Sequence, residues 1–328
     1  MLKNKLPRRL RETLYVFIHS PNYIGLSLRP DSYLGGALYY FFVCIVHPYE
    51  YFMRRFYLKK YVEQPTNIIS KKEGYYVDSH ANSETVNAAI EHCREIIKRK
   101  NWDDVNDPQH KSFLLQYWFE PGDACHNKIW KLAVDPLIIS PIVEYLGYVP
   151  LLGSALLWYS PNNNFESGRS QEFHLDGDNN KQVKVFVFLD DIDEQSGPLT
   201  IIPAEQSKIA FKKMKIKSLV ERRNNKVNDK TMYQFCNKED EVVFLGKKGC
   251  IGFVDTDSCY HFGSRPGNKK RLILQLQYIS QAGSHQATFN RNIDLRVKEL
   301  LKDDPNNLVN EYILGFTHLA HPKTKNIG

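Results

Sequence analysis

Apolar residues follow a helical period in one part of this chain of 328 residues. Within residues 66–150 they recur every three or four positions, as at Val86, Ile90 and Cys93, which is typical of one buried helix face. Ser83 is a suitable N-cap for that helix. Asp135 and Pro136 fit the start of a second helix and Gly147 its end. We therefore predict that residues 66–150 form a helical buttress.

The pattern changes at residues 151–283, where short apolar runs rich in β-branched and aromatic residues are separated by Gly, Pro, Asn and Asp. Short strands bounded by turn residues are typical of a β-sandwich or barrel. The sequence thus predicts a mainly β core with flanking helices. The predicted strands are 155–160, 183–189, 198–203, 249–254 and 271–279.

A basic insertion, residues 207–241, interrupts this β core. Between Lys208 and Lys230 there are nine basic residues but only two acidic ones, Glu221 and Asp229. Such a charge run is typical of a solvated surface loop. A lid that attracts a phosphate- or carboxylate-bearing substrate is the functional alternative.

The N-terminal extension, residues 1–65, combines basic residues with an uncharged apolar run at 34–46. That run is short for a membrane span, and its basic and aromatic flanks suit a membrane surface or a packing segment. No signal peptide is visible, and the six cysteines have irregular spacing without a CxxC pair. We expect free thiols and a cytoplasmic protein, with peripheral contact with a membrane as an open alternative. The net charge of +7 allows an anionic partner, but the basic residues lack the aromatic interleaving of a nucleic-acid groove.

His174 and Asp176 are candidate metal ligands because residues two apart in an extended chain point the same way. His261 is a second candidate histidine, and Pro266-Gly267 after it suggests a type II turn. The strand of His261 would then fold back beside the strand that starts at Arg271. Two histidines and one carboxylate leave metal positions open, as in non-haem iron sites, and an arginine can grip a carboxylate.

Three blocks of sequence resemble the Fe(II)/2-oxoglutarate dioxygenases of the phytanoyl-CoA dioxygenase-like family. They are FHLDGD, SGPLTIIPAEQS and GCIGFVDTDSCYHFGSR with KKRLILQLQY. The middle block ends in Pro-Ala-Glu-Gln-Ser, where the family usually has Pro-Gly-Ser-His, so that match is partial. The resemblance covers residues 150–282 and implies a double-stranded β-helix, or jelly roll, within a dioxygenase domain at 66–328.

The resemblance also implies roles for individual residues. His174, Asp176 and His261 would hold Fe(II), while Arg271, helped by Ser264, would bind the distal carboxylate of the cosubstrate 2-oxoglutarate. O2 would be the oxidant, and the intact carboxylate ligand favours hydroxylation of an unactivated C–H over halogenation. Other cations that could bind this carboxylate are Arg265, Lys269 and Lys270, which lie in or beside the expected turn.

The substrate is the open part of this hypothesis. We expect a small, anionic or lipid-linked molecule, with Trp158, Tyr159, Arg169 and Gln171 as candidate contacts. One alternative is a peptide or protein hydroxylase on the same fold. Others are a non-catalytic jelly-roll binding protein and, from Cys259 beside His261, a zinc pair.

Overall fold

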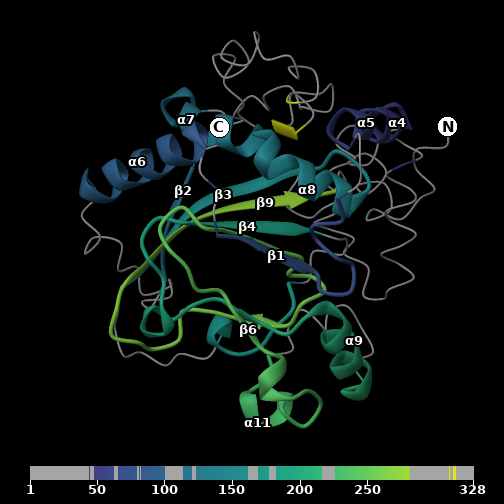
Figure 1. The fold of residues 1–328 in the computed structure, drawn as a ribbon, viewed down its shortest axis with the longest axis vertical. Coiled ribbons are helices and arrows are strands. Elements are labelled where there is room, and N and C mark those ends of the chain that lie inside the picture. The colour runs from purple at the N-terminus through teal and green to yellow at the C-terminus, as the bar shows by residue number, and fades with distance from the viewer. Residues whose placement is uncertain are drawn as a thin grey trace, which may run out of the picture.

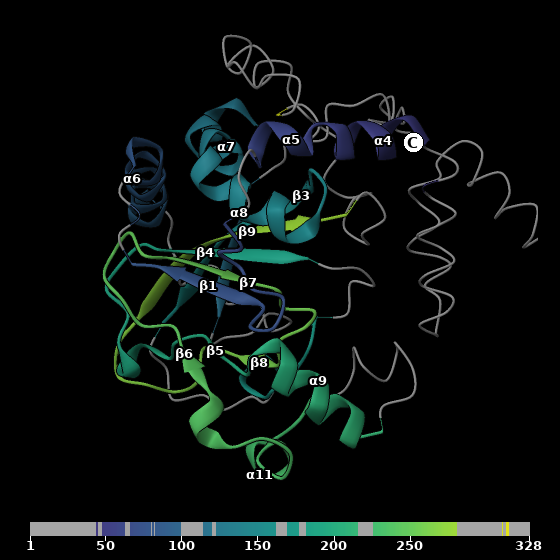
Figure 2. The same ribbon diagram turned by 45° about the vertical axis from the view of Figure 1, so that its right-hand side comes forward.

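The computed structural model describes residues 48–62, 66–79, 81, 83–99, 114–119, 123–161, 169–176, 182–215 and 226–280, with Cys44, Asn310, Ile313 and Leu314. Two antiparallel sheets lie face to face, with helices on the outer side of each (Figures 1 and 2). The prediction of a mainly β core with flanking helices is therefore confirmed. This two-layer arrangement is that of the double-stranded β-helix.

The larger sheet has six strands in the order β1-β7-β4-β9-β3-β2. Its bounds are β1 Tyr75–Asp78, β2 Leu115–Trp118, β3 Leu151–Ser160, β4 Val183–Phe188, β7 Ile251–Val254 and β9 Arg271–Ile279. The predicted strands at 155–160, 183–189, 249–254 and 271–279 all lie here. The prediction that residues 66–150 are helical does not include the edge strands β1 and β2. For these two segments the prediction is wrong.

The smaller sheet has three strands in the order β6-β5-β8. They are β5 Thr200–Ile201, β6 Val242–Val243 and β8 His261–Phe262. This sheet faces the larger one across the interior of the molecule (Figure 2). The strand of His261 therefore pairs with β5, not with β9.

Helices on the outer face of the larger sheet bury its apolar side. Along β9, Leu272, Leu274 and Leu276 belong to the core shared with these helices, whereas Arg271, Ile273 and Gln275 line a cavity between the sheets. The period-two alternation of a strand thus separates packing residues from site residues. The helices are α6 Glu84–Arg99, α7 Asn127–Val134 and α8 Pro136–Leu146. The 3-10 helix η3 Ala124–His126 directly precedes α7.

The predicted helix signals of this region are confirmed. Ser83 Oγ accepts a hydrogen bond from the backbone N–H of Val86 at 3.2 Å, and the Asp135 carboxylate accepts one from Leu137 at 2.8 Å. Gly147 ends α8 with φ +79°.

Helices α4 Pro48–Phe56 and α5 Leu58–Tyr61 are the described part of the N-terminal zone. Arg54 on α4 is 2% exposed and donates hydrogen bonds of 3.0 Å to the carbonyls of Val149 and Pro150. This end of the extension therefore packs against the segment that joins α8 to β3. Among the described residues no helix is long and apolar enough to cross a bilayer, and the apolar run 34–46 lies outside them except for Cys44.

On the outer side of the smaller sheet lie α9 Ala204–Lys213 and α11 Asp229–Met232. Both belong to the basic insertion or adjoin it. The 3-10 helices η4 Arg169–Gln171, η5 Glu194–Ser196 and η6 Lys238–Asp240 connect the strands. The described lysines of α9 are exposed, and none of them lines the cavity between the sheets.

Candidate metal centre

His174 and His261 are brought together by the backbone. They form an antiparallel bridge in which each N–H donates to the other's carbonyl at 3.0 Å. Such a hydrogen-bonded pair places both side chains on the same face, and the two ring centroids lie 4.3 Å apart. Asp176, two residues after His174, is held by a 2.9 Å hydrogen bond from its N–H to the Thr256 carbonyl.

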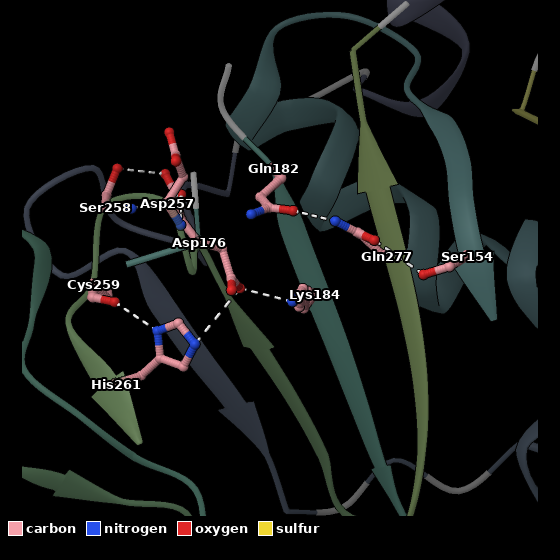
Figure 3. A network of polar contacts seen from close by, with 10 residues as sticks. Ser154, Asp176, Gln182, Lys184, Asp257, Ser258, Cys259, His261 and Gln277 are labelled. Atoms are coloured by element: carbon pink, nitrogen blue, oxygen red, sulfur yellow. Dashed lines mark hydrogen bonds and ion pairs between the residues drawn. The ribbon is translucent and has the colours of Figure 1, made fainter. Parts of the chain in front are cut away.

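The two imidazole rings present the same nitrogen to the same space. Nδ1 of His174 lies 2.9 Å from the Glu172 carbonyl, and Nδ1 of His261 lies 3.0 Å from the Cys259 carbonyl. A carbonyl can only accept, so each Nδ1 carries the proton and each Nε2 keeps its lone pair. Hydrogen bonds of this kind orient metal-ligating histidines. Figure 3 shows His261 turned in this way between Cys259 and Asp176.

The protonation states suit cation binding. Burial, followed by the neighbouring His261, lowers the pKa of His174 to about 3, and burial also lowers the pKa of His261. Burial tends to raise the pKa of Asp176, but the Lys184 ammonium and then the two histidines outweigh it and hold that pKa below its usual range. Near neutral pH the site therefore offers two neutral nitrogens and one carboxylate.

These three ligand groups form one cluster. Their ligand atoms, one from each residue, all lie within 4.8 Å of one another. The distance from Asp176 Oδ2 to His261 Nε2 is 3.6 Å. Two histidines and one carboxylate suit a divalent first-row metal with open positions. The structure thus brings together all three residues that the sequence singled out as ligands.

Arg271 and Ser264 meet in the same cavity, although not by the predicted route. The expected pairing of the two strands is wrong: β9 pairs with β3 and β4 in the larger sheet, while His261 lies in the smaller one. Gly267 is not among the glycines with positive φ, so no type II turn forms. Residues 263–270 instead cross from one sheet to the other. Arg271 Nη2 donates to Ser264 Oγ at 2.5 Å, and both residues are buried.

The cavity has a volume of about 190 Å³, which is small beside the ~300–1,000 Å³ of typical ligand pockets. The three ligand groups, Ser264 and Arg271 all line it. Within the described part of the chain two of its lining residues have a buried N–H group without a partner, Trp158 Nε1 and Arg271 Nη1. Burial lowers the pKa of Arg271 to about 10, so the guanidinium is charged at neutral pH. Such donors call for an acceptor, most simply a carboxylate.

Lys184 is the site residue that the sequence reasoning missed. It lies on β4, lines the cavity, and donates from Nζ to Asp176 Oδ2 at 2.7 Å (Figure 3). Its signal was a single charged residue inside the apolar run VKVFVFL. On a strand, a lysine at such a position can face either solvent or a cavity, so the pattern alone did not indicate its partner.

The other predicted contacts are divided between the cavity and its support. Trp158 lines the cavity, whereas Tyr159 packs against the core of the larger sheet. Gln171 Nε2 donates to the Ser264 carbonyl at 2.7 Å and so supports the segment that carries Ser264. The side chain of Arg169 lies outside the described residues.

The competing cations have other partners. Arg265 forms a two-point pair with the Asp229 carboxylate at 2.6 and 2.9 Å, and its guanidinium lies 3.2 Å from the Phe262 ring centroid. Lys269 pairs with Asp193. Lys270 is exposed and does not line the cavity between the sheets. Of these four predicted cations, Arg271 is therefore the one that lines the cavity.

The predicted alternative of a zinc pair is contradicted by the position of Cys259. Its thiol contacts the carbonyls of Glu73 and Gly74 at 3.5 and 3.8 Å, and burial raises its pKa well above the usual value. None of the six cysteines is joined to another in a disulfide.

A second group of possible ligands lies at the start of α7. It consists of Asp123, Cys125 and His126. Both ring nitrogens of His126 already have protein partners, since Nδ1 lies 3.0 Å from His92 Nε2 and Nε2 lies 3.2 Å from the Tyr117 hydroxyl. We therefore assign this group a packing role between α6 and α7.

No family model matches the chain, and no curated protein does. Solved structures resemble it distantly. They include the non-haem α-ketoglutarate-dependent epimerase SnoN from nogalamycin biosynthesis, with 13% identity, a TM-score of 0.46, and coverage of 68% of this chain and 86% of that one. HygX from Streptomyces hygroscopicus, with nickel, 2-oxoglutarate and hygromycin B bound, has 15% identity, a TM-score of 0.42, and coverage of 65% and 84%.

EctD from S. alaskensis has 17% identity, a TM-score of 0.45, and coverage of 64% of this chain and 74% of that one. All three likenesses are distant and concern the fold. The assignment of the site therefore stands on the residues of this chain. Membership of the phytanoyl-CoA dioxygenase-like family stays a prediction.

Proposed function

We propose that this protein is an Fe(II)- and 2-oxoglutarate-dependent dioxygenase that hydroxylates an unactivated C–H of a small anionic or lipid-linked molecule. The observation that carries the proposal is the joint presence, in one small cavity, of the His174–Asp176–His261 cluster and the buried Arg271 guanidinium. Either feature alone has ordinary structural explanations. Together they match a metal and a ligand with a free carboxylate.

The residues present fit both groups. Two neutral imidazoles and one carboxylate would hold Fe(II) and leave positions open on one side. Arg271 Nη1, buried and without a partner among the described residues, would bind the distal carboxylate of 2-oxoglutarate. When bound, iron and 2-oxoglutarate supply the O2 chemistry that hydroxylates carbon, with loss of carbon dioxide and formation of succinate.

The chain's own residues would bind, orient and exclude water. The Glu172 and Cys259 carbonyls fix the ring orientation of the two histidines. Ser264 Oγ holds one end of the Arg271 guanidinium, so its other end is aimed into the cavity. Phe186, Leu199 and Ile273 provide apolar cavity wall, which keeps bulk water away from the metal side.

The charges of the cavity favour an anionic substrate. Among its described lining residues Asp176 is the only acid, while Lys184 and Arg271 are both cationic. A divalent metal with dianionic 2-oxoglutarate would still leave the cavity with one excess positive charge. An anionic group on the substrate would neutralise it.

The test of the proposal is turnover in the presence and absence of Asp176. With Fe(II), 2-oxoglutarate and a panel of carboxylated and phosphorylated small molecules, the wild-type protein should release succinate in step with hydroxylated product. Asp176→Ala should abolish coupled turnover because it removes the carboxylate of the proposed ligand set. Full coupled turnover in that variant would contradict the proposed function. So would a folded wild-type protein that binds no divalent metal.

A peripheral membrane contact through the N-terminal extension is a further part of the proposal. Tyr49, Phe52 and Phe56 of α4 are 64–67% exposed and recur at i, i+3 and i+7, on one helix face. Exposed aromatics beside basic residues suit a headgroup layer. Flotation with anionic liposomes at low salt should carry the wild-type protein upward, and Phe52→Ser with Phe56→Ser should reduce that fraction. Absence of wild-type binding would remove the membrane contact.

A further inference from the structure

Lys184 lies where a strand would ordinarily place an apolar residue. Its neighbours Val183 and Val185 are fully buried, and its own side chain is 17% exposed. Lys184 and Phe186 both line the cavity, as the alternation of β4 requires. The ammonium group is thus held inside the molecule, next to the metal cluster.

Lys184 contacts Asp176 Oδ2, the carboxylate oxygen that a metal in the cluster would also use. Its Nζ lies 2.7 Å from Asp176 Oδ2, and the same Oδ2 lies 3.6 Å from His261 Nε2. Oδ2 is therefore the carboxylate oxygen that faces the histidine cluster. A cation that enters the cluster must share or take over this oxygen. Without metal, the Lys184 ammonium serves as an internal cation at that position (Figure 3).

A metal that takes over the Asp176 carboxylate would deprive the Lys184 ammonium of this counter-ion. Among the described residues that line the cavity, Asp176 is the only acid. Once a metal binds Asp176, the Lys184 ammonium, on a side chain that is 17% exposed, lies beside a divalent cation and shares its one described acidic partner with it. A buried charge without a counter-ion is strongly unfavourable. An anionic ligand that binds the metal and Lys184 together would remove that penalty.

We infer that Lys184 is an anion-binding residue on the open side of the metal, and that metal and anion therefore bind cooperatively. The ligand class is a carboxylate or related oxyanion that coordinates the metal directly. Its site differs from that of Arg271, which would bind a carboxylate at the far end of the ligand. The inference rests on the proposed function only in placing a divalent metal at the His174–Asp176–His261 cluster.

The probe is oxalate, which can chelate a metal but is too short to carry a distal carboxylate to Arg271. Binding of Co²⁺ would be measured anaerobically by calorimetry, with and without oxalate, in wild-type, Lys184→Met and Lys184→Gln proteins. The matched control is Lys247→Met, because Lys247 Nζ also pairs with an aspartate, Asp191, at 2.8 Å but is exposed. Circular dichroism would confirm that each variant is folded.

Both Lys184 variants should bind Co²⁺ alone at least ~10-fold more tightly than the wild type, because the internal competitor is gone. A charge-assisted hydrogen bond contributes enough to change an equilibrium by ~10- to 100-fold. The enhancement of Co²⁺ affinity by oxalate should therefore fall by at least ~10-fold relative to the wild type. Lys247→Met should match the wild type in both measurements.

Two results would overturn the inference, and they differ in what else they overturn. If Co²⁺ binds to the wild type but the Lys184 variants show unchanged or weaker affinity and the same oxalate effect, Lys184 only supports Asp176, and the proposed function stands. If Co²⁺ binds to neither wild-type nor variant protein, with or without oxalate, both the inference and the proposed function fail.

Discussion

Replacement of Arg271 by methionine should affect the ligand-free and ligand-bound proteins in opposite directions. Arg271 is 6% exposed, and its Nη1 is buried without a partner among the described residues. The ligand-free protein therefore carries a buried charge whose counter-ion the ligand would supply. Methionine keeps much of the apolar stem but removes that charge.

The magnitude follows from the pKa. Burial lowers the pKa of Arg271 from the usual arginine range to about 10, which corresponds to about 3 kcal/mol at 1.36 kcal/mol for each pKa unit. Because the folded-state pKa is lower than the unfolded one, this penalty is fully present at pH 7 and is lost only as pH rises above about 10. Loss of the charge-assisted hydrogen bond to Ser264 opposes the gain by about 1.5 kcal/mol. Arg271→Met should thus stabilise the ligand-free protein by about 1–2 kcal/mol.

The ligand-bound protein should respond in the opposite way. In the wild type, 2-oxoglutarate with a divalent metal at 100 times its dissociation constant adds about 2.7 kcal/mol to the free energy of unfolding. Removal of one partner of a buried ion pair costs about 3–5 kcal/mol, so the variant should lose nearly all of this stabilisation.

Urea unfolding at pH 7 measures both effects, with Arg99→Met as the control because Arg99 is exposed. The reasoning is refuted if Arg271→Met destabilises the ligand-free protein while the stabilisation by 2-oxoglutarate persists.

Three further predictions concern stability. His174, with its pKa lowered to about 3, makes the folded protein lose stability as pH falls from 6.5 toward 3, so His174→Asn should flatten urea-derived stability over that window by about 1.4 kcal/mol for each pH unit. Gly197→Ala should lower the free energy of unfolding by more than ~2 kcal/mol, because φ is +60° and a Cβ would lie 2.4 Å from the Arg265 carbonyl oxygen. The control Gly147→Ala, with φ +79° and open space around it, should lower it by only ~1 kcal/mol. Equal losses in the two variants would contradict the close approach at Gly197. Arg54→Met should cost at least ~2 kcal/mol by urea unfolding, since it leaves two buried carbonyls unpaired, and a neutral effect would mean that α4 is not anchored as described.

Much of the β core could be predicted because its strands carry a strong local signal. β3, β4 and β9 are runs of 10, 6 and 9 residues that are mostly apolar or aromatic. The edge strands β1 and β2 have only four residues each, and most of these are half-buried. At that length the alternation is too short to distinguish a strand from a loop between helices.

The site could be predicted in its members but not in its assembly. The HxD spacing and the family-like blocks identified His174, Asp176, His261, Ser264 and Arg271. The predicted path of the chain from His261 to Arg271 was wrong, because a Pro-Gly pair does not indicate whether the chain turns back or crosses to another sheet. Gly267 is needed there for a close approach, since a Cβ would lie 2.1 Å from the Gln195 carbonyl oxygen. Such a contact joins segments far apart in sequence and leaves no local pattern.

Lys184 shows the same limit for electrostatics. Its neighbours in sequence are all apolar, and its partner Asp176 reaches it only through the fold. The pairing changes the interpretation of the site, because the carboxylate ligand is already neutralised by a cation of the protein itself. We therefore expect metal affinity to depend on Lys184, a residue outside the proposed ligand set.

The measurement that tests the central claim most directly is an anaerobic titration of the purified protein with Fe(II) and 2-oxoglutarate, followed by visible absorbance. A weak charge-transfer band should appear only when both are present, and it should be lost in His261→Ala and in Arg271→Ala. If folded wild-type protein never develops the band, the metal and cosubstrate assignments are contradicted, and a non-catalytic binding protein becomes the better account of this cavity.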